Sequence, residues 1–117
     1  MVKTDPEYLI DVADELTKDG WKEISQQLTE QEILNLNPFL WHKLDWLEIS
    51  EKQNLSEDFI REFKDKVYWD AISLFKTLSE DFIIEFKDEV NWKGISFRQT
   101  ISKTLSKSFR KEFKSYL

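Results

Sequence analysis

Apolar and polar positions alternate along this chain in a pattern that returns about every 23 residues. The clearest signal is a Trp-x-x-Ile-Ser segment that begins at Trp46, at Trp69 and again at Trp92, so that successive segments start 23 positions apart. In each segment the Trp and the Ile are three positions apart and therefore share one face of a helix. The regular return predicts a repeated helical unit.

A second apolar stripe at helical spacing follows each of these segments. It begins with Leu-Ser-Glu-Asp at 55–58 and again at 78–81. Ser56 and Ser79 occupy the position at which an N-cap hydroxyl accepts a hydrogen bond from a backbone N–H. The chain ends on the same pattern at 105–117, displaced by four residues, which is about one helical turn. Each unit is therefore predicted to be a pair of short helices.

Capping signals predict further helices toward the N-terminus. The segment Thr4-Asp5-Pro6-Glu7 combines a capping box with a Pro in the first turn, and Gly20 is the expected stop of the helix that it opens. Thr29-Glu-Gln-Glu32 is another capping box, and Asn37-Pro38 is expected to break or restart a helix. The predicted helices cover 5–19, 21–27, 29–35, 38–44, 46–53, 56–67, 69–76, 79–90, 92–103 and 106–116.

Helices this short cannot bury their apolar stripes alone, so each must pack on its neighbours. We predict an all-α fold in which short helical hairpins stack as a small solenoid-like single domain over residues 1–117. Its segments are an N-terminal capping helix at 1–20, a degenerate repeat at 21–45, repeats at 46–68 and 69–91, and a basic C-terminal repeat at 92–117. The equivalent positions predicted to be largely buried are Trp46, Ile49, Phe59, Phe63, Trp69, Ile72, Phe82, Phe86, Trp92 and Ile95.

Composition narrows the class of protein. Of 117 residues, 40% are hydrophobic and 34% are charged, which suffices for a core, and the presence of only two Gly and two Pro disfavours a turn-rich β-fold. Cysteine is absent, which excludes disulfides and suits a reducing compartment. No apolar run approaches the ~20 residues of a membrane span, and the acidic N-terminus is unlike a targeting peptide. We expect a cytoplasmic protein without membrane contact.

Side chains that recur in every unit are better explained by architecture than by catalysis. The Glu-Asp pairs at 57–58 and 80–81 resemble acid/base pairs, but their places at helix starts assign them to capping. The repeated Ser residues lack the base that a nucleophile needs, since the chain has one His. That residue, His42, has Asp45 near it in sequence but not the further ligands of a metal site. We predict no enzyme activity, no cofactor and no metal.

Charge is distributed unevenly along the chain. Residues 1–45 hold four Lys against ten acidic side chains, and residues 46–90 hold six basic against twelve acidic. Residues 91–117 reverse the balance, with seven basic side chains against Glu112. A terminal repeat is expected to be polar outside, but either sign of charge would meet that need. The consistent positive sign therefore predicts a partner-binding surface.

The last unit also departs from the repeat at three positions. The Glu-Asp pair becomes Lys107-Ser108, and the position of Ile60 is taken by Arg110. The residues predicted to contact a partner are Arg98, Lys103, Lys107, Arg110, Lys111 and Lys114.

The repeat resembles one that occurs in hypothetical proteins of phages and giant viruses. The resemblance rests on Trp-x-x-Ile-Ser followed by Leu-Ser-Glu-x-Phe-Ile-x-Glu-Phe-Lys-Asp-x-Val, and it is close over residues 46–96. It implies a viral or mobile-element origin, and hence the cytoplasm of a host cell, but it implies no particular activity.

Stacked short hairpins present extended surfaces, which favours a protein–protein interaction module. With the viral resemblance, this predicts a small inhibitor or adaptor that binds a host protein or nucleoprotein bearing acidic or phosphate groups, such as a defence component. The alternative is nucleic-acid binding through the basic C-terminal unit, whose cations are interleaved with Phe97, Phe109, Phe113 and Tyr116. The phenylalanines, however, fall on core positions. Homo-oligomers that join an acidic front to a basic end are a further alternative.

Overall fold

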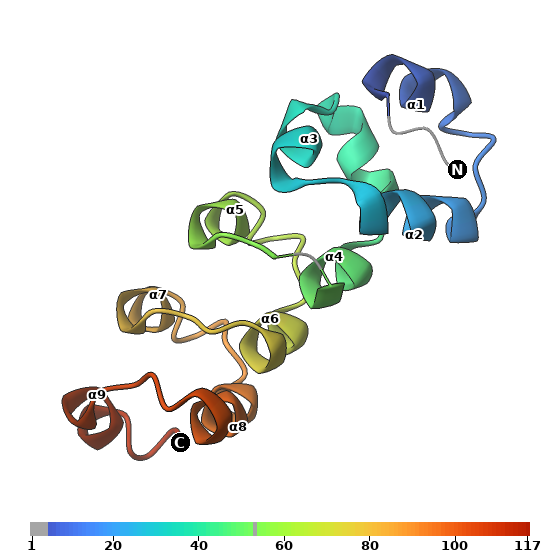
Figure 1. Cartoon of the computed structure of the whole chain (residues 1–117). Helices are drawn as coiled ribbons and strands as arrows, with labels where there is room; N and C mark the ends of the chain where they lie inside the picture. Colours follow the sequence, from blue (N-terminus) through green and yellow to red (C-terminus); the bar gives the residue numbers. More distant parts are fainter. Residues whose placement is uncertain (1–4, 53) are drawn as a thin grey trace. The chain divides into compact units, whose positions relative to one another are not determined.

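Helices are the only regular secondary structure over the residues that the structure describes, which confirms the predicted all-α fold. The structure is a computed structural model that describes residues 5–52 and 54–117. Its helices are α1 Pro6–Val12, α2 Lys18–Gln27, α3 Glu30–Asn35, η1 Pro38–Lys43, α4 Trp46–Lys52, α5 Glu57–Glu62, α6 Trp69–Phe75, α7 Glu80–Glu85, α8 Trp92–Ser102 and α9 Lys107–Glu112 (Figure 1). The predicted helix at 38–44 is η1, which is a 3-10 helix.

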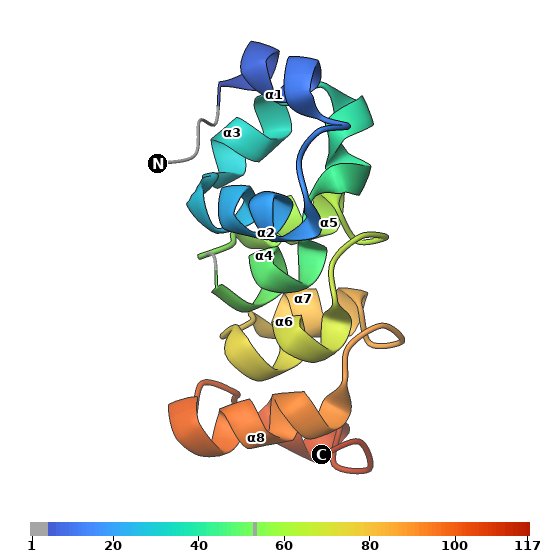
Figure 2. The same cartoon turned by 90° about the vertical axis from the view of Figure 1, so that its right-hand side faces the viewer.

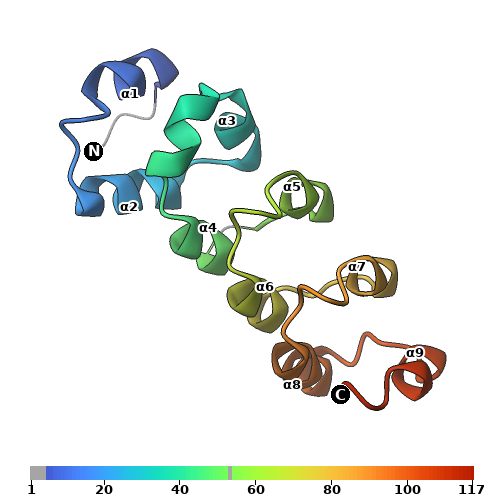
Figure 3. The same cartoon turned by 180° about the vertical axis from the view of Figure 1, so that it is seen from behind.

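The helices gather into two compact units. Unit 1 ends at Lys66 and holds α1 to α5, and unit 2 runs from Val67 to Leu117 and holds α6 to α9. In unit 1, α2 packs against α4, and in unit 2, α6 packs against α8 (Figure 2). Within unit 2, α6 and α8 form one row and α7 and α9 form another (Figures 1 and 3). The predicted solenoid-like domain over the whole chain stays a prediction.

The predicted starts of α3, α5 and α7 are confirmed by their caps. Ser56 Oγ accepts a hydrogen bond from the Phe59 N–H at 3.1 Å, and Ser79 makes the same bond at the start of α7 at 3.2 Å. The capping box at α3 is complete, because the Thr29 and Glu32 side chains each accept the other's backbone N–H. These starts depend on residues within one turn of the helix, which is why the sequence shows them.

Three predicted helices were too long at their C-terminal ends, namely 56–67, 79–90 and 106–116. α5, α7 and α9 each have six residues, and the backbone leaves helical geometry at Phe63, Phe86 and Phe113. In unit 2, the carbonyl of Lys87 in the turn after α7 accepts a hydrogen bond from Trp92 Nε1 at 3.0 Å. A continuing helix would have used that carbonyl for its own ladder, so the indole contact replaces the last helical turns.

The predicted N-terminal helix at 5–19 is wrong in its second half, and Gly20 is not a stop. α1 ends at Val12, and Thr17 caps a new helix by accepting the Gly20 N–H at 3.1 Å. Gly20 therefore lies in the first turn of α2. At the start of α1 the Asp5 side chain accepts the N–H groups of the two residues after Pro6. The predicted cap at Thr4 and the predicted helix end at Gln53 lie outside the described residues.

Most of the predicted core is buried. The eight predicted positions that are at most 8% exposed are Trp46, Ile49, Phe59, Phe63, Ile72, Phe82, Phe86 and Ile95. Trp69 and Trp92 were predicted to be buried but are half-buried. The Trp92 ring packs against Tyr116 at 4.7 Å between centroids, and Tyr116 is itself 50% exposed, so this cover is incomplete.

Aromatic packing is nevertheless equivalent in the repeats that begin at Trp46 and Trp69, as predicted. Trp46 lies 6.3 Å from Phe59 and 4.9 Å from Phe63, measured between ring centroids. Trp69 lies 6.1 Å from Phe82 and 5.0 Å from Phe86. Trp46 and Trp69 therefore make equivalent contacts, whereas Trp92 packs on Phe113 at 5.6 Å and on Tyr116.

The Ser of Trp-x-x-Ile-Ser joins one repeat to the next within each unit. In unit 1, Ser25 Oγ accepts a hydrogen bond from the Asp45 N–H at 2.8 Å. In unit 2, Ser73 Oγ accepts one from the Asn91 N–H at 2.9 Å. Asp45 and Asn91 both precede the first residue of the following Trp helix. The Ser hydroxyl thus positions the start of the next repeat's first helix.

The Glu at the start of the second helix acts in the same way. Glu80 accepts hydrogen bonds from the backbone N–H of Ser106 at 2.7 Å and from its hydroxyl at 3.0 Å. In unit 1, Glu30 accepts the N–H of Ser56. Ser106 and Ser56 are the N-caps of the following second helices. The predicted capping role of this Glu was thus incomplete, because its carboxylate reaches the next repeat.

Candidate functional site

The last repeat presents a strongly positive surface. Of the six cations predicted to bind a partner, Arg98 is half-buried, and those that are exposed are Lys103, Lys107, Arg110, Lys111 and Lys114. Between residues 91 and 117 the acidic side chain is Glu112, which is also exposed. The field at this surface is therefore dominated by cations, which attract anionic groups over about 8–10 Å at physiological salt.

α9 holds several of these cations on a well-anchored segment. Ser106 caps the helix by accepting the Phe109 N–H at 3.1 Å. Phe109 and Phe113 are 3% and 8% exposed and fix the inner side of the helix and of the turn that follows. The exposed cations on this segment are Lys107, Arg110, Lys111 and Lys114. Their backbone is thus held by the core while their ammonium and guanidinium groups remain in water.

Two of the predicted residues, Lys103 and Arg110, line one groove. The groove is open to solvent, and its lining consists of Ser96, Gln99, Thr100, Lys103, Leu105, Arg110 and Leu117. None of these lining residues is acidic. Lys103 ends α8 with left-handed geometry (φ 52°, ψ 39°), and its N–H donates to the Gln99 carbonyl at 2.8 Å. This sharp ending turns the chain from α8 toward α9 and leaves the groove between them.

The extra length of α8 explains why the last repeat is displaced by four residues. α8 has eleven residues, whereas α6, which starts at the equivalent Trp, has seven. The insertion is therefore absorbed as about one more turn of helix. That turn carries Thr100 and leads into Lys103, so the groove is lined partly by residues that the repeat consensus does not contain.

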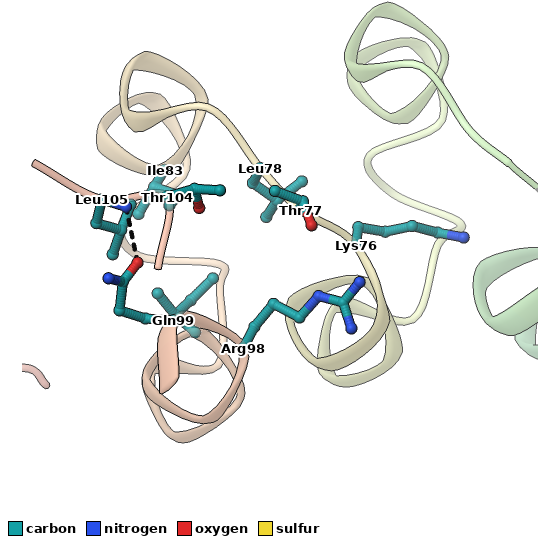
Figure 4. A pocket seen from close by; sticks show the side chains of 9 residues that line it. Lys76, Thr77, Leu78, Ile83, Arg98, Gln99, Thr104 and Leu105 are labelled. Atoms are coloured by element: carbon teal, nitrogen blue, oxygen red, sulfur yellow. Dashed lines mark hydrogen bonds between the residues drawn. The ribbon is translucent and has the colours of Figure 1, made fainter. Parts of the chain in front are cut away.

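Arg98 lies apart from these cations, in a second and smaller pocket. Figure 4 shows its side chain reaching from α8 toward the linker that carries Lys76 and Thr77. Gln99 Oε1 accepts the Leu105 N–H at 2.7 Å in this pocket, and both residues also line the groove of Lys103. The structure thus joins Lys103 with Arg110, places Arg98 beside the preceding repeat, and leaves the outer cations of α9 exposed.

Sequence reasoning missed Lys76, which belongs to the preceding repeat. Burial lowers the pKa of Lys76 below its usual value, and the nearby positive charge of Arg98 lowers it further. The sequence predicted Arg98 as a binding residue but gave no sign that Lys76 lies near it, because only the packing of α8 on α6 brings the two together.

Two of the departures from the repeat, at Lys107 and Arg110, lie on the side that meets a following repeat. In unit 2, Glu80 binds the cap of the next helix, and Ile83 is 2% exposed beside Leu105 of the next repeat. At the equivalent positions one repeat later stand Lys107 and Arg110, both exposed. An apolar and acidic contact face has thus been replaced by a basic one.

His42, which the sequence singled out as the one His, lies on the surface. It is exposed, and its ring lies edge-on to Phe39 at 4.9 Å between centroids. Within residues 5–52 and 54–117, no three His, Cys, Asp or Glu side chains form a group suited to a metal ion. In the same part of the chain, no helix has the length and apolar character needed to cross a membrane.

Comparisons of this chain with protein-family models, with curated proteins and with solved structures gave no match. The resemblance of the repeat to phage and giant-virus proteins therefore stays a prediction.

Proposed function

We propose that this chain is a protein-interaction module that binds an acidic or phosphate-bearing protein through the basic surface of its last repeat. The observation that carries the proposal is the replacement of Glu80 and Ile83 by the exposed Lys107 and Arg110 at equivalent positions. A charge change at contact positions alters which surface can dock there. A purely solvated end would require polar side chains but no single sign of charge.

The rest of the repeat supports binding rather than catalysis. Its recurring Ser and Glu side chains are engaged in joining repeats, as Ser73 and Glu80 illustrate. Its recurring Trp and Phe rings pack on one another. The side chains available for recognition are therefore those that vary between repeats, and in the last repeat the variation changes acidic and apolar positions to basic ones.

The viral resemblance supports a more specific form of the proposal. In that form the chain is a small phage- or virus-encoded inhibitor or adaptor that acts in the cytoplasm of a host cell, on a host protein such as a defence component. No catalytic residue is assigned.

The test compares three proteins as bait in a host-cell lysate. The first is the wild-type chain, the second carries Lys107→Glu, Arg110→Glu and Lys111→Glu, and the third is a control of equal net charge with Lys18→Glu, Lys64→Glu and Lys66→Glu. All six positions are exposed, so folding should change little. A true partner, identified by mass spectrometry, should bind the first and third baits alike. Titration should show at least tenfold weaker binding to the second, about 1.4 kcal/mol.

If the captured partner binds the triple Glu variant as tightly as the wild type, the basic surface is only a solvated surface and does not bind the partner. The partner surface would then lie on the acidic earlier repeats.

A second candidate function is favoured by two exposed aromatic side chains. Phe109 and Phe113 are buried, as expected for core positions, but Phe97 and Tyr116 are 56% and 50% exposed. Exposed rings among cations suit single-stranded nucleic acid, whose bases stack on aromatic faces. Fluorescence anisotropy with generic single-stranded DNA and RNA discriminates the two functions. Binding to both, with an affinity that falls steeply as salt rises, would favour this candidate.

A further inference from the structure

The groove of Lys103 and Arg110 lies at positions equivalent to Ser73 and Ile83. In the preceding repeat of the same unit, the next repeat packs at those positions. In the repeat register Ser96 is equivalent to Ser73, and Arg110 is equivalent to Ile83. Ser73 accepts the backbone N–H at the start of α8, and Ile83 is covered. Ser96 is half-exposed and lines the open groove. The groove therefore has the form of a helix-receiving face that no described residue covers.

Charge indicates what fits this face. Lys103 and Arg110 line the groove, no acidic residue lines it, and the surrounding residues 91–117 carry one acid among seven cations. The opposite composition occurs in this same chain, because residues 1–45 hold ten acids against four Lys. An occupant drawn from that region would complement the groove in sign.

α1 is the element of that region that is best suited to dock. Leu9 is fully buried in unit 1 and fixes the inner side of the helix. Glu7 and Asp11 lie on the opposite side, one turn apart, and both are exposed. Ile10 on the same helix is 46% exposed, so docking would also cover an apolar side chain.

We propose that α1 of a second copy of this chain docks in the groove, with Glu7 and Asp11 against Lys103 and Arg110. The two contact surfaces differ, so the association is head to tail, and each added copy leaves one groove and one α1 available. Association therefore continues beyond a dimer as concentration rises. The inference goes beyond the proposed function, because it requires α1, which a foreign partner of the basic surface does not.

Sedimentation of the full chain provides the first test. At about 10 mM salt, where charges act over about 30 Å, the average mass should exceed that of the monomer and rise with protein concentration. At about 1 M salt, where charges act over about 3 Å, the association should weaken at least tenfold. A chain that stays monomeric at millimolar concentration and low salt would overturn the proposal.

Charge exchange provides the second and more specific test. The groove variant carries Lys103→Glu and Arg110→Glu, and the helix variant carries Glu7→Lys and Asp11→Lys. Each should associate at least tenfold more weakly, because like charges then face each other. A chain with all four changes restores the opposite signs and should associate again. A control with Lys87→Glu and Lys93→Glu, two exposed cations outside the groove lining, should behave like the wild type.

Failure of the four-fold variant to associate, or association that neither pair of changes weakens, would refute the contact. Circular dichroism checks that each variant keeps its helices. If the groove variant with Lys103→Glu and Arg110→Glu loses helix, the variant with Lys103→Gln and Arg110→Gln takes its place. The helix variant, with Glu7→Lys and Asp11→Lys, distinguishes failure of this inference from failure of the proposed function. If it loses self-association but a foreign partner still binds, only the self-contact depends on α1.

Discussion

Two helix pairs, α2 with α4 in unit 1 and α6 with α8 in unit 2, pack through the same hydrogen bond but differ in the residue at their contact. Both pairs share the hydrogen bond from the Ser hydroxyl to the next helix start, at 2.8 Å for Ser25 and 2.9 Å for Ser73. They differ two residues after the second Trp, where α4 has Glu48 and α8 has Gly94. The comparison separates what every repeat needs from what each contact adjusts.

In unit 1 the contact includes a buried carboxylate. Glu48 is 5% exposed and accepts a hydrogen bond from Gln26 Nε2 at 2.8 Å, with Lys22 Nζ at 4.0 Å. A buried carboxylate requires such partners to offset its lost hydration. In this pair the space at the contact is filled by a long polar side chain and its hydrogen bond.

In unit 2 the backbones approach so closely that a side chain at position 94 would be crowded. A Cβ on Gly94 would lie 3.0 Å from the Cβ of Ser73 and 3.1 Å from the backbone N of Leu74. The Leu74 backbone belongs to α6 and cannot move without disturbing that helix. The Ser hydrogen bond is therefore the common device, and the residue at the Glu48 position sets how close the helices come.

Loss of a core Phe should have the largest effect and should be similar in both units. Phe63 packs on Trp46 at 4.9 Å and Phe86 packs on Trp69 at 5.0 Å. Phe63→Ala and Phe86→Ala should each lower the free energy of unfolding by about 3–5 kcal/mol, measured by urea denaturation. Phe39→Ala, at a side chain that is 61% exposed, is the control and should change it by less than about 0.5 kcal/mol. An unchanged stability for Phe63→Ala or Phe86→Ala would invalidate the repeat alignment.

The glycines of the two units should respond in opposite directions. Gly94→Val should destabilise by about 1–3 kcal/mol, because its side chain would meet the backbone of α6. Gly20→Ala should stabilise by up to about 1 kcal/mol, since its nearest contact would be Leu16 Cδ2 at 3.4 Å and Ala favours a helix. Thermal and urea denaturation of both variants test the contrast. Equal effects of the two substitutions would contradict the close approach of α8 to α6.

Removal of the shared Ser hydroxyl should cost less, and by similar amounts in both pairs. Ser25→Ala and Ser73→Ala each leave the backbone N–H of the next helix start without its acceptor, which should cost about 1–2 kcal/mol. Ser96→Ala, at the same motif position but half-exposed in the groove, is the matched control and should change stability by less than about 0.5 kcal/mol. A loss at Ser96 as large as that at Ser73 would argue against this role for the hydroxyl.

The smallest expected effect concerns the pKa of Lys76. Arg98→Met removes the second cause of its lowering, so the pKa should rise toward the usual value, although burial should still hold it below. Because the folded pKa lies below that of the unfolded chain, stability should increase as pH rises from the lowered pKa to the usual one. Arg98→Met should reduce that increase. An NMR titration of the Lys side chains tests the shift, with Lys87→Met as a control that should leave the Lys76 pKa unchanged.

By itself, the sequence determined the repeat, most of the helix starts and most of the core. Caps such as Ser56 and Thr29 act within one helical turn, and stripes such as that of Phe59 and Phe63 follow the helical period, so both are visible in the order of residues. The concentration of cations in the last repeat was visible in the same way.

The tertiary structure alone decided the helix ends, the place of Gly20 and the grouping of the cations. α7 stops early where the Lys87 carbonyl meets the indole of Trp92. Arg98 is separated from Arg110 and placed beside Lys76 because α8 packs on α6. These features depend on which groups meet across helices that lie far apart in the sequence. The local periodicity of the sequence does not show which groups will meet. These features can therefore be seen only in the packed structure.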